Sequence, residues 1–375
     1  MQFREVIGQQ AIKKRLINAV RDNRVSHAQL FYGPEGCGNL ALALAYAQYL
    51  SCPDRTEEDS CGACTSCRKF QNLQHADLNF SYPFVASKAS KVTTAADVSQ
   101  TWIDSVKKTP YLNLEYWLQQ LDAENKQPLI NVKESERIAH VLSLKAYEGG
   151  YKFMVIWLPE RMNNGAANKL LKLLEEPPDK TVFLLVSHDY ENIIPTIQSR
   201  TQLVKINALS DEEVSRALIE KYDASKEKAT SVAHLADGDF FRALQLLGDN
   251  KESNANFDFF VSWMRFCYKQ NLKELVRWTD EMAKVGRENQ KRFLEYSLHM
   301  VRQCIVKNYT KGELGKLTPG EAAFADKFSP FINHANVIQL TDELNQAHRE
   351  IGQNIYGKIL FFDLSIKVSK LLRKT

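Results

Sequence analysis

The first 207 residues alternate between two kinds of hydrophobic pattern. Residues 9–22 repeat apolar side chains at helical spacing, and residues 40–50, which are rich in Ala and Leu, predict a second helix. Residues 27–32, 151–158 and 181–186 are nearly continuous apolar runs, which are typical of strands buried on both faces of a parallel sheet. Helices that alternate with such strands predict a three-layer α/β domain.

One helix of this domain has clear ends in the sequence. Asn163 or Asn164 can cap its first turn, and Pro177 and Pro178 stop it, because proline cannot continue a helix. A segment at about 86–127 does not follow the alternation. It begins small and polar and then becomes rich in aromatic residues, so we expect a loop with one or two helices inserted into the α/β domain.

The strand pattern ends after Asn207. Residues 208–250 are predicted to form short helices, and amphipathic helical patterns run from 257 to 375. A polar linker at 248–256 separates these two helical regions. We therefore expect three domains: the α/β domain at 1–207, a small helical domain at 208–250 and a larger helical domain at 257–375.

Composition and charge narrow the class of protein. The 375 residues are 44% hydrophobic and 25% charged, as in an ordinary globular protein. No apolar run is long enough to span a membrane, and the polar N-terminus is unlike a secretory signal, so a cytoplasmic protein is expected. The first 256 residues carry 30 basic and 32 acidic side chains. This balance opposes a stand-alone DNA-binding protein, because neutralising phosphates needs Lys and Arg in excess.

A glycine-rich turn follows the predicted strand at 27–32. It contains Gly33, Gly36 and Gly38, and the first and last of these have four residues between them. That spacing, between a strand and a helix, is the spacing of a phosphate-binding P-loop, whose backbone N–H groups surround phosphates. An ordinary glycine-rich turn is the alternative interpretation.

The side chains that give a P-loop its electrostatics are replaced here. Asn39 stands at the position of the phosphate-binding Lys, and Leu40 at that of the Mg²⁺-binding Ser or Thr. A later strand of a working ATPase ends in an acidic pair, whereas the strand here ends in Leu158-Pro159-Glu160. Glu160 can take the acidic role only if the register slips. These differences predict an ATPase fold without ATPase chemistry of its own.

Four of the seven cysteines lie within sixteen positions, in the pattern Cys52-x8-Cys61-x2-Cys64-x2-Cys67. In a reducing compartment such clustering favours a metal over disulfides. Four thiolates suit tetrahedral Zn²⁺ in a closed structural site. We therefore expect one structural Zn²⁺, and a set of unrelated buried thiols is the alternative. The other three cysteines are expected to be small buried or near-surface residues: Cys37, Cys267 and Cys304.

Seven motifs follow one another in order along the chain. They are Val6-Ile7-Gly8-Gln9, Ser26-His27-Ala28, Phe31-x-Gly33-Pro34, the cysteine cluster, His75-x-Asp77-Leu78, Asn168-x-Leu170-Leu171-Lys172-x-Leu174-Glu175-Glu176-Pro177-Pro178, and Ile197-x-Ser199-Arg200. Together they resemble a bacterial clamp-loader subunit of the AAA+ superfamily. The matches cover most of residues 3–83 and 130–247, and Thr201 stands where the family usually has Cys.

The resemblance implies a fold. Motor subunits of this family keep the P-loop Lys and the acidic pair, whereas delta-prime subunits lack a functional ATP site and keep the Ser-Arg motif. This sequence resembles the second combination. The implied fold is an α/β AAA+ domain with a P-loop-like parallel sheet and a zinc module at about 52–67. A helical lid at 208–250 and an all-α collar domain at 257–375 follow.

The resemblance also implies partners and a task. The partners are clamp-loader motor subunits and a delta-type subunit in a pentameric ring, the sliding clamp, and primed DNA reached through the complex, with no membrane contact. The task is to help load the clamp in DNA replication as a component of the DNA polymerase III holoenzyme. No ATP hydrolysis by this chain itself is expected.

Arg200, together with Ser199, has an implied catalytic role. An arginine presented to ATP on a neighbouring subunit stabilises the charge that develops in the transition state. For the dipeptide alone, a surface arginine at a helix end is the alternative. Arg242 lies near the position of a nucleotide-sensing arginine in motor subunits, but the surrounding pattern matches only loosely.

Two other functions stay open at this point. The first is an active AAA+ motor, which Asn39, Leu40 and the Leu158-Pro159 ending oppose. The second is a zinc-stabilised nucleic-acid-binding protein without ring partners, which the near-neutral charge opposes.

Overall fold

The computed structural model describes residues 1–87, 91–123, 126–148, 150–248, 252–310, 317–353 and 355–373. The chain divides into two compact units, Met1–Leu247 and Gly248–Thr375. The boundary expected near residue 207 lies inside the first unit, which therefore contains both the α/β part and the short helices that follow it. The expected linker at 248–256 lies partly outside the described residues.

A five-stranded parallel sheet forms the centre of the first unit. Its strands lie in the order β2-β3-β4-β1-β5. The predicted strands β1, β3 and β4 are confirmed, whereas β2 and β5 have only four residues each and carry no continuous apolar run. Their bounds are β1 (Ala28–Tyr32), β2 (Leu78–Ser81), β3 (Lys152–Trp157), β4 (Thr181–Ser187) and β5 (Gln202–Lys205).

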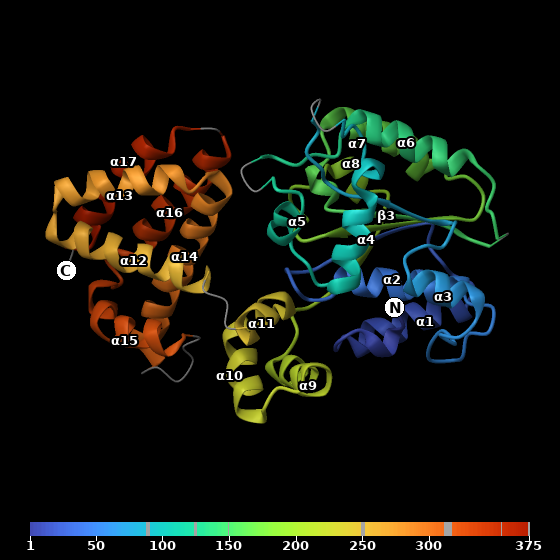
Figure 1. Ribbon diagram of the computed structural model, residues 1–375, viewed down its shortest axis with the longest axis horizontal. Coiled ribbons are helices and arrows are strands. Elements are labelled where there is room, and N and C mark those ends of the chain that lie inside the picture. The colour runs from blue at the N-terminus through green and yellow to red at the C-terminus, as the bar shows by residue number, and fades with distance from the viewer. Residues whose placement is uncertain are drawn as a thin grey trace. The chain divides into compact units, whose positions relative to one another are not determined.

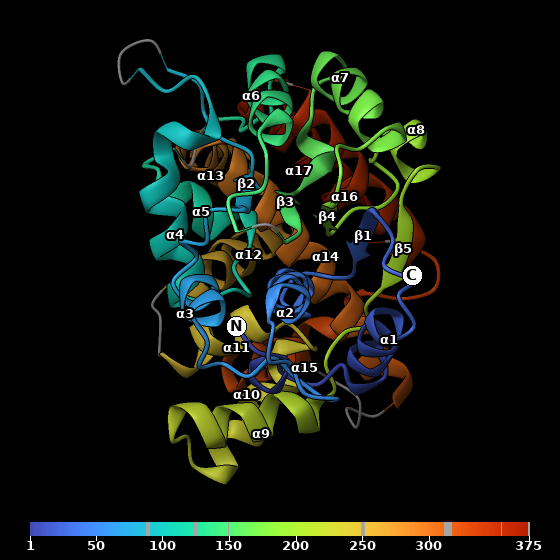
Figure 2. The same ribbon diagram turned by 90° about the vertical axis from the view of Figure 1, so that its right-hand side faces the viewer.

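Helices cover both faces of this sheet. Figure 1 shows α6 and α7 on one face and α1, α2 and α3 on the other, and Figure 2 gives the same layering from the side. The helices of this unit are α1 (Gln10–Arg21), α2 (Asn39–Ser51), α3 (Thr65–Gln71), α4 (Ser99–Lys108), α5 (Leu114–Gln120), α6 (Val132–Ser143), α7 (Asn164–Glu175), α8 (Pro195–Gln198), α9 (Asp211–Tyr222), α10 (Lys226–Ala236) and α11 (Phe240–Leu247).

The period of two along β4 produces the layers. Leu184 belongs to the core on the α2 side, and Leu185 to the core on the side of α6 and α7. Every residue of β3 and β4 is buried, as the apolar runs predict. Helix α7 begins as expected, because the Asn163 side chain accepts a hydrogen bond from the Ala166 N–H at 2.8 Å.

The inserted segment belongs to the core of the first unit. It contains α4 and α5, and its Trp102 and Trp117 are fully buried. The Trp102 ring stacks on Tyr82 at 4.2 Å and lies 5.1 Å from Trp157 at the end of β3. Aromatic pairs of this kind contribute through their large buried area and their ring geometry. The segment is therefore part of the framework that carries the site.

The described part of the second unit is helical throughout. Its core contains a stacked pair of indole rings, Trp263 and Trp278, at 5.3 Å, with Phe293 and Phe361 against them. Among the described helices of the whole chain, none has the length and apolar character needed to cross a membrane. The helices of this unit are α12 (Glu252–Lys269), α13 (Leu272–Lys284), α14 (Arg287–Thr310), α15 (Pro319–Phe328), α16 (Val337–Gly352) and α17 (Gly357–Leu371).

Candidate functional site

The glycine-rich turn lies at the carboxyl end of β1 and leads directly into α2. Strand β1 lies between β4 and β5 in the sheet. The turn is therefore among the carboxyl ends of the strands, which is where open α/β folds bind ligands. Gly36 and Gly38 have φ of 67° and 90°, a region that glycine occupies without a steric penalty. The local geometry therefore has the strand–turn–helix form of a phosphate loop.

Neither residue that replaces the P-loop Lys and hydroxyl faces solvent. Asn39 is 4% exposed, and its Nδ2 donates a hydrogen bond to the Ser187 carbonyl of β4 at 3.1 Å. Its Oδ1 accepts from the backbone N–H of Leu40, which is 1% exposed. Both side chains serve the packing of α2 against the sheet. Cys37 is also buried, which raises its pKa to about 12.

The ends of β3 and β4 bring Glu160 and His188 together. Leu158 adopts a left-handed conformation with φ of 56° and starts a short 3₁₀ turn at Pro159–Arg161. The Glu160 carboxylate accepts a hydrogen bond from the His188 N–H at 3.4 Å, and its Oε2 is buried without a described hydrogen-bond partner. Burial raises the pKa of Glu160 to about 7.

The neighbouring imidazole carries no positive charge near neutral pH. Burial lowers the pKa of His188 to about 4, so its 3.7 Å approach to Glu35 is not an ion pair there. Glu160 belongs to no metal-binding group of side chains within the described part of the chain. The place of the expected acidic pair is thus occupied by one buried carboxyl group and a neutral histidine.

Two side chains from other segments lie on the turn. Tyr111, between α4 and α5, is 6% exposed, and its hydroxyl accepts a hydrogen bond from the Ile7 N–H at 2.8 Å. Asp239 caps α11 by accepting from the Arg242 N–H at 3.1 Å. The Phe240 N–H donates to the carbonyl of Gly36 at 3.2 Å. Neither residue is among those predicted from the sequence to have a role: an Asp just before a helical segment is a signal for a helix cap, whereas no local pattern points to Tyr111.

Arg200 follows α8 and contacts the end of α7. Its Nε donates to the Glu175 carboxylate at 2.6 Å, and Nη2 forms an ion pair with the same group. Nη1 donates to the Thr196 carbonyl at 3.0 Å and to Ser199 Oγ at 3.3 Å. The Arg200 side chain is 34% exposed. Two of the motifs recognised in the sequence therefore meet, and none of the described contacts of Arg200 involves the glycine-rich turn.

The four clustered cysteines converge on one point. Their sulfur atoms all lie within 4.8 Å of one another, with 4.0 Å between Cys52 and Cys64 and 3.9 Å between Cys61 and Cys67. A tetrahedral Zn²⁺ with Zn–S bonds of ~2.3 Å requires S···S separations of ~3.8 Å. The cluster therefore fits a four-thiolate zinc site.

The backbone around the cluster favours thiolates. The N–H groups of Cys64 and Ala63 donate to the sulfur of Cys61, which lowers its pKa to about 7. Burial raises the pKa of the Cys52 and Cys67 thiols. A bound cation would offset that burial cost by favouring the ionised form.

The His75-x-Asp77-Leu78 motif holds the segment before β3 in place. The Asp77 carboxylate accepts from the N–H groups of Tyr147 at 2.8 Å and Glu148 at 3.0 Å. His75 is buried; its Nδ1 accepts from the Asp77 N–H, which leaves Nε2 to face Glu148 at 3.1 Å. Because each polar group of this network has a partner inside the chain, the motif is structural.

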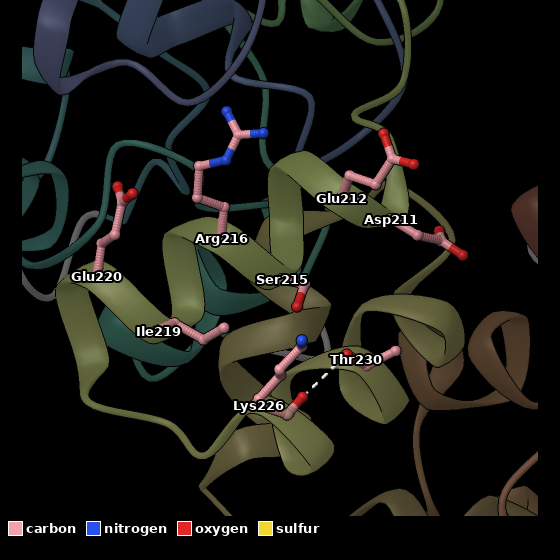
Figure 3. A pocket seen from close by; sticks show the side chains of 8 residues that line it. All are labelled: Asp211, Glu212, Ser215, Arg216, Ile219, Glu220, Lys226 and Thr230. Carbon is pink, nitrogen blue, oxygen red and sulfur yellow. Dashed lines mark hydrogen bonds between the residues drawn. The ribbon is translucent and has the colours of Figure 1, made fainter.

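A shallow groove on α9 and α10 is separate from all of these residues. Figure 3 shows the acidic and basic side chains that line it, with the polar ends of Ser215 and Lys226 between the two helices. Charges of both signs give it no preference for one class of ligand. It is lined by Asp211, Glu212, Ser215, Arg216, Ile219, Glu220, Lys226 and Thr230.

A parallel sheet with a phosphate-loop-shaped turn at its carboxyl edge defines an α/β protein of the P-loop type, here with the loop's Lys and hydroxyl replaced. The model of the family described as DNA polymerase III, delta subunit, matches residues 8–210. The match covers more than half of the chain, and the chain belongs to this family.

Similar proteins carry related names. The chain is 23% identical to DNA polymerase III subunit tau of Bacillus subtilis over 98% of its own length and 61% of that protein. It is 31% identical to DNA polymerase III subunit delta' of Pseudomonas aeruginosa over 47% of this chain and 41% of that one. The chain thus spans less than two thirds of these relatives. A gamma subunit-related protein of Thermotoga maritima is 14% identical, with a TM-score of 0.37 over 98% of this chain and all of that one.

Proposed function

We propose that this chain is a non-hydrolysing clamp-loader subunit of DNA polymerase III that supplies Arg200 to the ATP of an adjacent subunit. The observation that carries the proposal is the fate of the glycine-rich turn: it keeps the backbone form of a phosphate loop, but Asn39 and Leu40 are buried in the packing of α2. Family membership makes a replication task the natural context for this combination.

The absence of hydrolysis follows from charge. A phosphoryl group in transfer carries negative charge that Lys and Mg²⁺ normally neutralise. Asn39 offers no positive charge, Leu40 offers no Mg²⁺ ligand, and Glu160 has a pKa raised by burial, so it is a poor metal ligand near neutral pH. An active motor is therefore the weaker alternative.

The role in trans rests on Arg200 and its surroundings. Its guanidinium lies at the surface beside Ser199, where a second protein can reach it. The Glu175 carboxylate accepts a hydrogen bond from Nε of Arg200. Before a phosphate binds, this ion pair has to open, or the guanidinium has to share its N–H donors between the carboxylate and the phosphate. Finger-type arginines accelerate phosphoryl transfer ~10³–10⁵-fold.

The cysteine cluster completes the proposal as a structural zinc module. Cys52, Cys61, Cys64 and Cys67 would hold one Zn²⁺ with four thiolates, and such a closed site has no open position for chemistry. The module also secures the N-terminal segment, because the Asp59 carboxylate accepts from the Phe3 N–H at 3.0 Å. The partners in this proposal are motor subunits, a delta-type subunit, the sliding clamp and primed DNA, all in the cytoplasm.

The test uses rings reconstituted from this chain and clamp-loader motor subunits. Steady-state ATPase and clamp loading are measured at saturating clamp and primed DNA with the wild-type chain or with Arg200→Ala. We expect the variant ring to assemble with normal zinc content, and the site that this chain serves to lose ~10³-fold in rate. Sites that use other subunits' arginines dilute the total loss.

Two variants control for charge and shape. Arg216→Ala removes an exposed arginine of α9 and should leave the rate unchanged. Arg200→Lys should rescue only partly, because an ammonium lacks the forked donors of a guanidinium. Equal rates for the wild-type and Arg200→Ala rings would reduce the chain to a structural subunit. ATP turnover by the isolated chain would instead support an active motor, and a failure to join any ring would support the zinc-stabilised nucleic-acid-binding protein.

A further inference from the structure

Residues 1–9 join parts of the first compact unit that lie far apart in the sequence. Their first half contacts the loop that carries the four cysteines. Their second half contacts the inserted segment, the glycine-rich turn and α9. We call residues 1–9 the N-terminal strap. The function proposed above gives the strap no task, and the contacts at its two ends define one.

The loop next to the cysteines holds the first half of the strap. The Asp59 carboxylate accepts hydrogen bonds from two successive backbone groups, the Phe3 N–H at 3.0 Å and the Arg4 N–H at 2.9 Å. The Gln2 side chain is buried, and its Nε2 donates to the Ser60 carbonyl at 2.6 Å. Both loop residues directly precede the second cysteine of the cluster. Any movement of the backbone at the cluster therefore reaches the groups that hold the strap.

The middle of the strap is bonded to α9 and to the inserted segment. The Glu5 carbonyl accepts from Nζ of Lys221, in the last turn of α9, at 2.5 Å. The Ile7 N–H donates to the hydroxyl of Tyr111 at 2.8 Å. These partners lie 216 and 104 positions away in the sequence. The strap thus holds together elements that are remote from one another along the chain.

The end of the strap reaches the glycine-rich turn. Gln9 Nε2 donates to the Cys37 carbonyl in the turn at 3.2 Å, and to the Asn207 carbonyl in the connection from β5 to α9 at 2.7 Å. Gln9 has φ of 59°, a left-handed conformation that costs free energy in a residue with a Cβ and persists where its surroundings fix it. Loss of the other anchors of the strap would let this residue relax, and the turn and α9 would lose a common contact.

We infer that the N-terminal strap couples the cysteine cluster to the glycine-rich turn and to α9, so that loss of metal from the cluster loosens both. The inference rests on the zinc module of the proposed function and extends it, because it gives the metal a role beyond its own loop. A metal held by four thiolates ties four points of that loop together. Without the ion, Asp59 and Ser60 are free to move, and their hold on the strap weakens with them.

Phe3 keeps the release of the strap partial. Its side chain is buried, and its ring lies 5.6 Å from that of Tyr49 on α2. This apolar contact does not depend on the hydrogen bonds to Asp59 and Ser60. We therefore expect a local opening of the strap and of α9 rather than unfolding of the unit. Such an opening accelerates amide hydrogen exchange in the affected segments more than elsewhere.

The experiment measures amide hydrogen exchange of the full chain by mass spectrometry, together with its zinc content. The decisive variant is Asp59→Ala, which releases the strap and keeps all four thiolates. With zinc still bound, its exchange in residues 1–9 and 207–222 should rise at least ~10-fold more than in residues 164–175 of α7. Removing zinc from the wild-type chain with a chelator should give the same pattern. Glu58→Ala is the matched control, because none of the described hydrogen bonds of this neighbouring residue involves the strap.

Equal changes in residues 207–222 and 164–175 of the zinc-loaded Asp59→Ala chain would overturn the inference. Chelation that accelerates exchange in the cysteine loop alone would also overturn it. Where Asp59→Ala loses zinc or fails to fold, Gln2→Ala removes the donor to Ser60 from the side of the strap, and the same comparison decides. A wild-type chain without zinc would refute the zinc module and the metal dependence together, whereas a zinc-loaded chain whose strap ignores the metal would refute the inference alone.

Discussion

The cysteine cluster and the glycine-rich turn belong to the same compact unit, but they differ in what has been retained. In the cluster, all four ligand atoms lie within 4.8 Å of one another. In the turn, the backbone form is present, while the side chains that would meet phosphate are buried or replaced. The comparison shows that packing of α2 against the sheet can require the form of a phosphate loop even where the residues that would contact phosphate are buried or replaced.

The reason lies in what each site does for the fold. The cluster ties a loop that has little core of its own, and a metal ion bound there would contribute folding free energy directly. The turn joins β1 to α2, whose residues 39–50 are all buried, so its shape is required by packing whether or not nucleotide binds. Loss of the first site should destabilise the chain, whereas changes at the second should mainly alter binding.

The largest effect is expected from Cys64→Ser. Structural zinc sites contribute ~10 kcal/mol or more of binding free energy in isolated modules, so the loss of one ligand should lower the free energy of unfolding by at least ~3 kcal/mol. The zinc content measured by metal analysis should fall from about one Zn²⁺ per chain to well below half, because the site requires four thiolates. Thermal unfolding with and without a chelator provides the second measurement.

Cys37→Ala is the matched control for this experiment. Cys37 is a buried cysteine of the turn that lies outside the cluster, so its loss should leave the zinc content at the wild-type level. If protein purified without chelator holds no zinc, or if both variants lose zinc equally, the distinction between the two regions is lost.

A smaller effect is expected from Glu160→Gln, and it depends on pH. The pKa of Glu160 is raised by burial from 4.5 to about 7, so the folded chain holds a proton that the unfolded chain releases between these values. Stability is therefore lost as pH rises through this window, by up to ~3 kcal/mol, and Gln removes that loss. The variant should gain stability relative to the wild type at pH 8 and little at pH 4.5.

Urea unfolding at pH 4.5, 6 and 8 measures this difference. Glu212→Gln, at an exposed position of α9, should show no such dependence. A stability difference that is constant across the three pH values would mean that Glu160 ionises normally. The carboxyl would then be available to a cation, which would reopen the interpretation of the turn as a working ATPase site.

Much of the first unit could be predicted from sequence because its central strands are buried on both faces. The strands β3 and β4 are buried along their whole length and therefore appear as continuous apolar runs. The strands β2 and β5 could not be found in this way. In β5 only Val204 is buried, so its pairing with β1 comes from tertiary structure and leaves no pattern in four residues.

The same distinction holds for the sites. The convergence of the four cysteines was predictable because their spacing in sequence sets their spacing in space, and their role as zinc ligands stays a prediction. The contacts of Tyr111 with Gly38 and Ile7 join residues more than seventy positions apart, and no local signal reports them. The Arg200–Glu175 contact is intermediate: both residues stand in recognised motifs, but only the fold reveals that they meet.

The smallest effect is expected from Glu175→Gln, which separates stability from function at the third site. The Arg200–Glu175 pair is exposed, with 34% and 48% of the two side chains accessible, and exposed ion pairs contribute only ~0–1 kcal/mol. The free energy of unfolding should therefore change by less than ~1 kcal/mol. In the proposed function Glu175 competes with phosphate for the guanidinium, so the variant should raise the ATPase rate of reconstituted rings, by no more than ~5-fold. Glu176→Gln, the adjacent exposed carboxylate, should change neither quantity. A rate that falls as far as in Arg200→Ala would instead mean that Glu175 positions the arginine for its neighbour, and that the pair persists in the working ring.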